Sequence, residues 1–315
     1  MATVRNLRNL ILSGIDDTHV DKVCAYLTNE KAVAGSRMFP FRFYTAFDVL
    51  TELDIFAETK LNPPKRVHDQ KEALKRNKAF QAIKKKQNQM NKGAIHRFYE
   101  ALESAIAISA KRNVPPIKGS TLLICATGLE VRDNNVAKKV SNETSNALTV
   151  SLLFTLMAAE AAEEVKVMTY DSRTVKQRTF GDRDKSILAT VKNLRELIAN
   201  MPSVESSVDN LIKTALMSLI RQQVSYDTII LVHGSQQPGD CNMMHNWLKQ
   251  YRHLVNPDMV YADINVQSSE SLESEIDMKN IYMAGFSEAI FHVLAKVSYE
   301  CIMTINRAST LISFP

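Results

Sequence analysis

A single apolar run places the strongest constraint on how this chain folds. Residues 121–126 form a continuous apolar stretch, entered from Pro115-Pro116-Ile-Lys-Gly119 and left through Gly128 into a polar loop. A run of this kind predicts a strand that is buried on both faces of a parallel sheet. Ligands of doubly wound α/β folds bind beyond the carboxyl ends of such strands, so residues 127–133 are the first place to look for chemistry.

The sequence on either side of this strand has two different characters. Residues 1–58 and 93–112 carry apolar residues at helical spacing, without strand patterns. After the strand, helices and strands alternate. We expect helices at 142–164, 184–199, 207–223, around 243–251 and at 287–296, a hairpin with one antiparallel edge at 165–180, and strands at 227–232, 259–266 and 281–283.

These patterns predict an α + α/β fold with two domains. Residues 1–114 would form a short helical-repeat (HEAT-like) segment, and residues 119–315 a doubly wound, mostly parallel Rossmann-like sheet of five or six strands. Pro115-Pro116 marks the expected boundary, because prolines end helices and are common in connecting segments. A chain of 315 residues is long enough for two cores.

Several classes of protein are disfavoured by what the sequence lacks. No apolar run approaches the roughly 20 residues of a membrane helix, and the N-terminus lacks the apolar core of a signal peptide. We expect a cytoplasmic or nuclear location with reduced thiols, because no Cys-x-x-Cys pair occurs. We expect no nucleotide cofactor, because neither a Gly-x-x-x-x-Gly-Lys-Ser/Thr nor a Gly-x-Gly-x-x-Gly motif is present. The cysteines are far apart in the sequence: Cys24, Cys125, Cys241 and Cys301.

A concentration of positive charge between residues 60 and 97 is the strongest functional signal. Twelve Lys and Arg residues face only Asp69 and Glu72 there, an excess of +10, although the whole chain carries only +5. The apolar stripe of this segment is thin, which predicts a protruding or weakly packed basic helix over about 60–92. A solvated charged helix or a nuclear-import signal would also explain such a sequence.

Cations at this density favour nucleic-acid binding, because each phosphate contact releases counterions. Aromatic residues nearby could stack on unpaired bases, although most of the phenylalanines at helical spacing are expected in the core. Our candidate RNA contacts are Lys75, Arg76, Lys78, Lys84, Lys85 and Lys86, with Arg37 and Arg42 as secondary candidates.

Several strings resemble the TROVE module shared by the Ro autoantigen and the vault- and telomerase-associated RNP protein. They are Thr3-Val-Arg-Asn-Leu7, Ser36-Arg-Met-Phe-Pro-Phe-Arg-Phe43, Tyr99-Glu-Ala-Leu-Glu-Ser-Ala105, Gly119-Ser-Thr-Leu-Leu-Ile124 and Met283-Ala-Gly-Phe-Ser287. The resemblance implies the last repeats of a helical ring followed by a von Willebrand A-like domain. It also implies binding of a small structured non-coding RNA within a ribonucleoprotein particle, together with other proteins. The family ring is usually longer at its N-terminal side, so the chain resembles the C-terminal part of such a protein or a truncated relative.

The same resemblance implies that the metal site of the α/β domain is degenerate. Von Willebrand A domains often hold Mg²⁺ through Asp-x-Ser-x-Ser after the first strand. The matching positions here are Thr127, Leu129 and Val131, and the position where the family has a second acid falls near Gly234, which has no side chain to ligate a cation. Leucine and valine side chains cannot ligate a cation. We therefore expect a scaffold without the usual metal.

Two other functional classes stay open. His233-Gly234-Ser235 follows a predicted strand, and such a loop is compatible with a chelatase-like or other metal-dependent enzyme, or with a hydrolase. No Gly-x-Ser-x-Gly elbow and no His-x-x-x-His pair accompany it. A protein-binding adaptor that uses the basic segment against an acidic partner is the other alternative. Trp247 with Met243, Met244 and Tyr251 could be a docking stripe, but helix packing on the sheet explains them better. We favour a non-enzymatic, RNA-binding component of a ribonucleoprotein particle.

Overall fold

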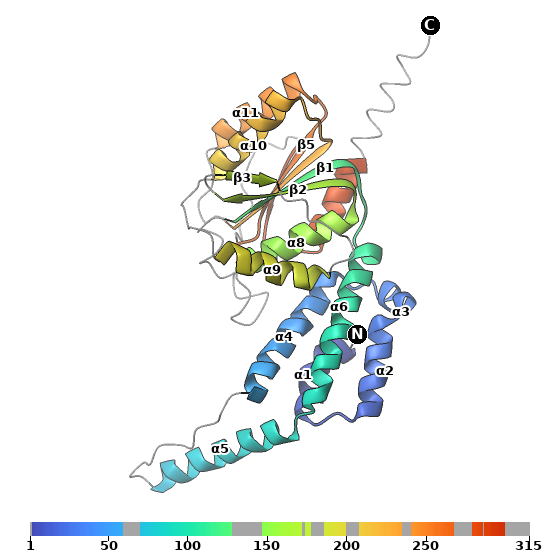
Figure 1. The fold of residues 1–315 in the computed structure, drawn as a ribbon, viewed down its shortest axis with the longest axis vertical. Coiled ribbons are helices and arrows are strands. Elements are labelled where there is room, and N and C mark those ends of the chain that lie inside the picture. Colours follow the sequence, from blue (N-terminus) through green and yellow to red (C-terminus); the bar gives the residue numbers. More distant parts are fainter. Residues whose placement is uncertain are drawn as a thin grey trace. The chain divides into compact units, whose positions relative to one another are not determined.

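The computed structural model describes residues 2–58, 70–127, 147–171, 174–177, 186–199, 208–234, 241–267, 279–285 and 287–299. The chain divides into two compact units, Met1–Ser109 and Ala110–Pro315 (Figure 1). Among the helices of these described ranges, none combines the length and apolar character needed to cross a bilayer.

The first unit is built from helices. Their bounds are α1 (Ala2–Leu12), α2 (Asp17–Thr28), α3 (Glu30–Gly35), α4 (Pro40–Glu58), α5 (Gln70–Gln89) and α6 (Lys92–Asn113), which reaches the boundary of the unit. Asp16 caps α2 by accepting from the backbone N–H of His19, and Asn29 caps α3 in the same way. The core of this unit is apolar and includes Leu7, Ile11, Leu27, Phe43, Leu50, Ile95, Phe98 and Leu102.

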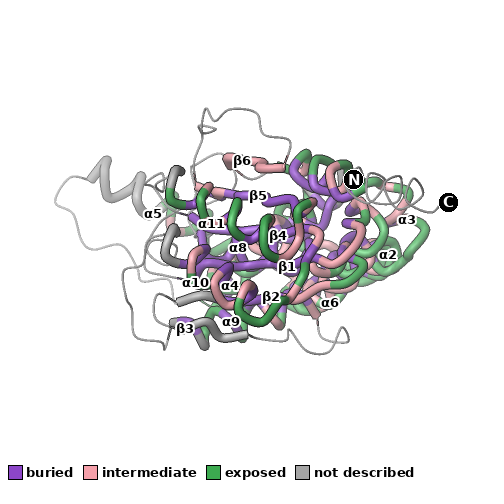
Figure 2. The backbone as a smooth tube through the Cα atoms, turned by 90° about the horizontal axis from the view of Figure 1, so that it is seen from above, coloured by how far each residue is buried: buried purple, intermediate pink, exposed green. Residues whose placement is uncertain are grey.

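The second unit contains a six-stranded sheet in the order β3-β2-β1-β4-β5-β6. Its strands are β1 (Ile117–Ala126), β2 (Ala162–Asp171), β3 (Thr174–Gln177), β4 (Thr228–His233), β5 (Val260–Asn265) and β6 (Asn280–Ala284). Every pair is parallel except β2 with β3, which is the predicted antiparallel edge. The central strands β1, β4 and β5 are mostly buried (Figure 2), as the continuous apolar runs of β1 and β4 predict.

Helices cover both faces of this sheet, as Figure 1 shows. The helices α8 (Ala147–Ala161) and α9 (Ile187–Ala199) lie on one face, and α10 (Val208–Gln222) and α11 (Cys241–Leu254) lie on the other. A helix over 289–299 joins the α8 side, where the rings of Phe154 and Phe291 stack with centroids 4.6 Å apart. The predicted α + α/β class, with a doubly wound, mostly parallel sheet, is therefore confirmed.

One expected helix ends earlier than its sequence suggests. We expected a helix over 142–164, but α8 ends at Ala161 and β2 begins at Ala162. Ala162 pairs with Ile117, and the Glu163 carboxylate accepts a hydrogen bond from the Gly119 N–H at 3.1 Å. Pairing with β1 therefore overrides the helical propensity of Ala-Ala-Glu-Glu.

A glycine corner joins β1 to the start of β4. Gly119 has a φ of +77°, and the Ser120 N–H donates to Asp227 Oδ2 at 2.8 Å. The Ser120 hydroxyl donates to the same oxygen at 2.9 Å. This corner aligns the first strand with its neighbour.

Candidate nucleic-acid interface

Residues 70–89 of the basic segment form α5, and the lysines of α5 whose side chains are described are exposed. Lys78, Lys84 and Lys85 lie on α5 and are exposed. Within the described chain, these three side chains have neither an ion pair nor a hydrogen bond. Lys75, Arg76 and Lys86 are also on α5, but their side chains fall outside the described residues, as do residues 60–69 of the predicted basic segment. Unpaired cations on an exposed helix are suited to a polyanion.

The C-terminal end of α5 is anchored to the rest of the helical unit. The Gln87 amide donates to the Phe56 carbonyl at 2.7 Å, and the Lys92 ammonium donates to the Ala57 carbonyl at 3.1 Å. Both bonds satisfy carbonyls in the last turn of α4, which have no partner within their own helix. Met90 is buried just beyond α5. The lysines at 84 and 85 are therefore held close to a fixed point.

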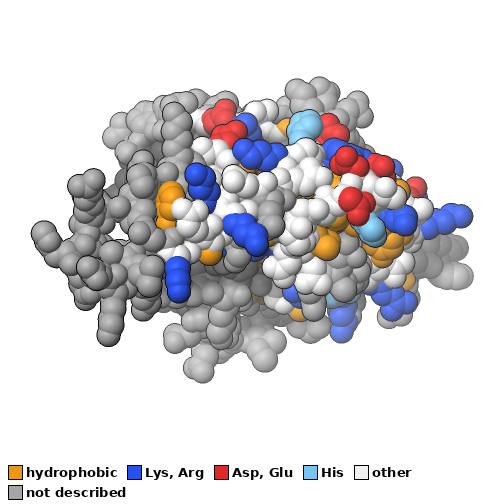
Figure 3. Space-filling model, turned by 90° about the horizontal axis from the view of Figure 1, so that it is seen from below, with side chains coloured by type: hydrophobic (Ala, Val, Ile, Leu, Met, Phe, Trp, Pro, Cys, Tyr) orange, Lys and Arg blue, Asp and Glu red, His pale blue; other side chains and the backbone are white. Residues whose placement is uncertain are grey.

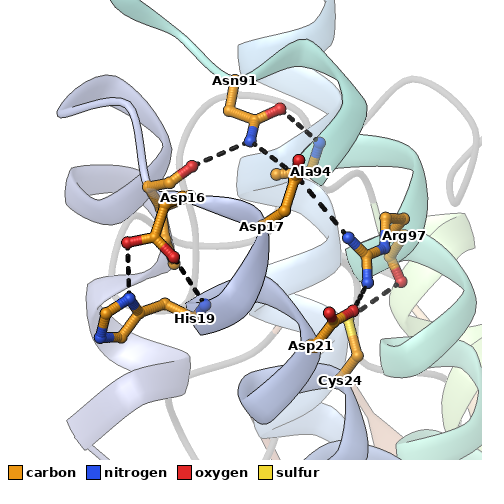
Figure 4. Close-up of polar contacts among 9 residues, drawn as sticks. Asp16, Asp17, His19, Asp21, Cys24, Asn91, Ala94 and Arg97 are labelled. Atoms are coloured by element: carbon orange, nitrogen blue, oxygen red, sulfur yellow. Dashed lines mark hydrogen bonds and ion pairs between the residues drawn. The ribbon is translucent and has the colours of Figure 1, made fainter.

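A polar network fixes the start of α6 beside α2 (Figure 4). Asn91 accepts from the Ala94 N–H at 3.0 Å and donates to the Ile15 carbonyl at 2.9 Å. Arg97 pairs with Asp21 and lies 3.7 Å from an Asp17 carboxylate oxygen. Arg97 counted toward the basic excess in the sequence, but these ion pairs reduce its availability to a ligand.

The secondary candidates lie at the other end of α4. Arg37 and Arg42 are both exposed, in the turn after α3 and in the first turn of α4. Arg37 has a φ of 53°, which is unusual for a residue with a side chain. About 14 residues of α4 separate Arg42 from the anchor at Phe56, roughly 20 Å at the rise of a helix. The two cationic groups therefore do not form one compact site.

Most of the aromatic side chains near these cations belong to the core. Phe39, Phe43, Tyr44 and Phe98 are buried, as expected for helical spacing. Tyr99 is half-buried, and burial raises the pKa of its hydroxyl, which donates to Thr51 Oγ1 at 3.3 Å. Lys and Arg side chains on the face drawn in Figure 3 stand apart from one another, with Asp and Glu among them. Because most of the rings near the candidate cations are buried, these cations offer phosphate contacts more readily than the rings offer base stacking.

The carboxyl edge of the sheet, where a von Willebrand A domain holds its metal, is closely packed. Thr127 is buried, and Leu129, Val131 and Ser235 lie outside the described residues. A Cβ on Gly234 would lie 2.9 Å from the Cβ of Ala147, at the start of α8. This close approach accounts for the glycine. Among the described residues, no group of three or more His, Cys, Asp or Glu side chains could hold a metal ion.

His233 takes part in a buried network that the sequence analysis missed. Its Nε2 lies 2.7 Å from Asp263 Oδ1, and the Tyr261 hydroxyl donates to Asp263 Oδ2 at 3.0 Å. Both His233 and Asp263 are buried. An Asp in the otherwise apolar run of β5 was the available signal. An Asp–His pair can in principle orient a general base, but here it also satisfies two buried polar groups.

The helical unit and the sheet unit match different family models. Residues 1–119 match the TROVE domain, and residues 132–304 match a domain of unknown function, DUF5920. Telomerase protein component 1 of Rattus norvegicus is 24% identical over 94% of this chain, and that of Mus musculus is 23% identical over the same share. The chain spans 12% of the length of each of these relatives.

A solved structure shares the fold. The crystal structure of the Deinococcus radiodurans RO (RSR) protein superimposes with a TM-score of 0.66 at 16% identity. The match covers 94% of this chain and 52% of that protein. It shows that helices followed by an α/β domain form a known combination.

Proposed function

We propose that this chain, a TROVE-module protein whose residues 132–304 belong to the DUF5920 family, is an RNA-binding, non-enzymatic component of a ribonucleoprotein particle. The similarity to telomerase protein component 1 supports a particle of that general kind. The ligand we propose is a small structured non-coding RNA, bound without a nucleotide cofactor. The particle would act in the cytoplasm, the nucleus or both.

The observation that carries this proposal is the exposed row of cations on α5. Lys78 and Lys85 are seven residues apart, which places them on the same side of the helix, and Lys84 is adjacent. Among the described residues none of these three lysines has an ion pair, so on that evidence the helix can approach a phosphate backbone without breaking one. Lys75, Arg76 and Lys86 would extend the contact along the helix, while Arg37 and Arg42 would touch a more distant part of the RNA.

The α/β unit has a different part in this proposal. The tight packing of Gly234 against Ala147 supports a scaffold role at the position where related domains hold a cation. The surface of this unit would then dock other proteins of the particle. The burial of His233 beside Asp263 favours a structural role for that pair over catalysis.

The proposal is tested by measuring RNA affinity against salt for the wild type and for a Lys78→Ala, Lys84→Ala, Lys85→Ala triple variant. The slope of log K against log salt should fall by up to about 2 to 3, at roughly 0.7–0.9 for each lost contact. The matched control is a triple Lys→Ala variant at Lys22, Lys31 and Lys192, which are also exposed.

The control triple should keep the wild-type slope. An equal loss in both triples would show that only net charge matters and would overturn the assignment to α5. Tight binding of polyglutamate, with no salt-dependent RNA binding, would replace the RNA ligand with an acidic protein.

A further inference from the structure

We propose that Gln267, at the carboxyl edge of the sheet, binds an unpaired nucleobase through its side-chain amide. The proposed function gives this edge only a scaffold role, so a base-binding site goes beyond it. The inference rests on the proposed function in one respect, because an RNA strand is one source of such a base. A free nucleoside is the other source, and both present the same chemistry, a base edge with a donor beside an acceptor.

The amide of Gln267 stands out among the buried polar groups that the structure describes. Its nitrogen and its oxygen are both buried, and neither has a hydrogen-bond partner. The other buried atoms of this kind are single hydroxyl oxygens, those of Thr121, Ser151 and Thr228. A primary amide carries two donors and an acceptor, and leaving them unpaired away from water is unfavourable. Since buried polar groups nearly always have partners, this amide is suited to one from outside the chain.

The backbone holds Gln267 in a defined place. The Val266 N–H donates to the His233 carbonyl at 2.8 Å, which continues the pairing of β5 with β4 beyond the last residue of β5. The Gln267 N–H donates to Asn265 Oδ1 at 3.1 Å. The side chain of Gln267 therefore starts from a fixed point beside the carboxyl end of β4.

This edge is where open α/β sheets bind their ligands. The strand order extends from β1 in both directions, so the switch point lies at the carboxyl ends of β1 and β4. Gly234 follows β4 there, and a Cβ on Gly234 would lie 3.5 Å from the amide carbon of Gln267. The same Cβ would lie 2.9 Å from the Cβ of Ala147, at the start of α8. A residue without a side chain at position 234 thus leaves room for the amide at this edge.

A nucleobase complements the amide better than other ligands do. A phosphate oxygen only accepts hydrogen bonds and a cation contacts only the amide oxygen, so each would satisfy half of the group. The N–H and C=O of a trans peptide point in opposite directions, so one peptide group does not meet both amide atoms. A base edge does, and Gln typically makes two hydrogen bonds to N6 and N7 of adenine. Unpaired bases of RNA are commonly recognised through such edges.

The amide loses little when it turns toward a base. It makes no hydrogen bond within the described chain, so a change of side-chain rotamer breaks none. Gln267 as a whole is only half-buried, so part of the residue already reaches solvent. Binding would therefore add hydrogen bonds without removing any from the free chain.

The test compares oligo(A) with an abasic phosphodiester of the same length and charge, both added to the full chain. Phosphate contacts bind both oligomers, whereas a base site favours oligo(A). We expect the wild type to bind oligo(A) about tenfold more tightly than the abasic oligomer. Gln267→Met should remove this preference and leave the salt slope unchanged, because Gln267 carries no charge.

The same variant has a readout in the free chain. Methionine is unbranched like glutamine but has no amide, so the Tm of Gln267→Met should rise by about 2–4 °C. Adenosine alone should raise the Tm of the wild type, and not of Gln267→Met, if the ligand is a free nucleoside. The matched control is Gln250→Met on α11, where Gln250 is exposed, and it should change neither the preference nor the Tm.

A second variant tests the chemistry of recognition. Gln267→Glu keeps an acceptor and removes the donors, and a carboxylate accepts from N4 of cytosine. This variant should therefore shift the preference from oligo(A) toward oligo(C). An unchanged preference for oligo(A) would overturn the assignment to Gln267.

Equal affinity of the wild type for oligo(A) and the abasic oligomer, or a preference that survives Gln267→Met, would overturn the inference. A lower Tm of Gln267→Met would show that the amide has a partner in the free chain, such as an ordered water, and would also overturn it. Adenosine binding without salt-dependent RNA binding would retain the inference while the proposed RNA function fails. Salt-dependent binding without any base preference would do the reverse.

Discussion

Nε2 of His233 lies 2.7 Å from Oδ1 of Asp263, across the neighbouring strands β4 and β5. The two residues are 30 positions apart in the sequence and both are buried. Tyr261 reaches the second carboxylate oxygen of Asp263, so one acid satisfies a histidine and a tyrosine. The pair therefore joins the neighbouring strands β4 and β5 through their side chains.

Replacing Asp263 with alanine should destabilise the fold. The change leaves the His233 ring and the Tyr261 hydroxyl without this partner, and losing one member of a buried pair costs about 3 kcal/mol. Urea unfolding measures the loss as a lower midpoint with an unchanged m-value. RNA affinity of the folded variant should stay at the wild-type level.

Asp258→Ala is the control for this prediction. Asp258 pairs with Lys279 at 3.1 Å, but their side chains are 41% and 44% exposed, and such surface pairs contribute at most about 1 kcal/mol. Equal, small losses in the two variants would mean that the His233–Asp263 contact contributes little to stability.

Gly119→Ala should also destabilise the sheet. A Cβ on Gly119 would lie 2.5 Å from Asp227 Oδ2, and the φ of +77° disfavours any side chain. The left-handed conformation alone costs about 1–2 kcal/mol, and displacing Asp227 would weaken its bonds to Ser120. Thermal unfolding should show a lower Tm.

The comparison for Gly119 is Gly35→Ala. A Cβ on Gly35 would meet nothing within 4 Å, and the residue lies in α3, where alanine has the better helical propensity. This variant should be neutral or slightly more stable. If Gly119→Ala behaved the same way, the glycine corner would not be needed.

The sequence predicted the parts of this structure that depend on local pattern. The apolar runs at 121–126 and 227–232 indicated buried strands because neither face of such a strand carries polar side chains for solvent. Both are central strands of the sheet. The end of α8 was wrong by a few residues because Ala162 pairs with a strand that is distant in sequence. Asp263 was missed for the same kind of reason. Its contact with His233 depends on the register of β4 and β5, which periodicity does not encode. That the lysines of α5 contact RNA stays a prediction.

The thiol of Cys125 should be unreactive in the folded protein. Burial in β1 raises its pKa from 9.0 to about 12, because the thiolate would have to form without solvent. The folded state therefore keeps the proton while the unfolded state loses it. This contribution to stability is complete below about pH 9 and is lost as the pH rises toward 12.

Iodoacetamide at pH 8 should leave Cys125 unmodified in the native chain and alkylate it in urea, as peptide mass analysis can show. Between pH 8 and pH 10, the free energy of unfolding should fall by about 1 kcal/mol less in Cys125→Ala than in the wild type. Rapid alkylation of the native chain at Cys125 would contradict the burial of this strand.

Arg37→Gly separates backbone strain from RNA contact. The φ of 53° at Arg37 belongs to the left-handed region that glycine adopts freely, so the substitution should raise the free energy of unfolding by up to about 1 kcal/mol. If Arg37 also contacts a phosphate, the same variant should bind RNA more weakly, with a salt slope lower by roughly 0.7–0.9.

Gln223→Gly provides the control, since Gln223 has the same φ at the end of α10 but is not a candidate RNA contact. It should relieve backbone strain, offset in part by loss of the Gln223 hydrogen bond to the Ile220 carbonyl, and leave the RNA slope unchanged. An Arg37→Gly chain that is more stable and binds RNA as the wild type does would remove Arg37 from the interface and leave α5 and Arg42 as the cationic candidates.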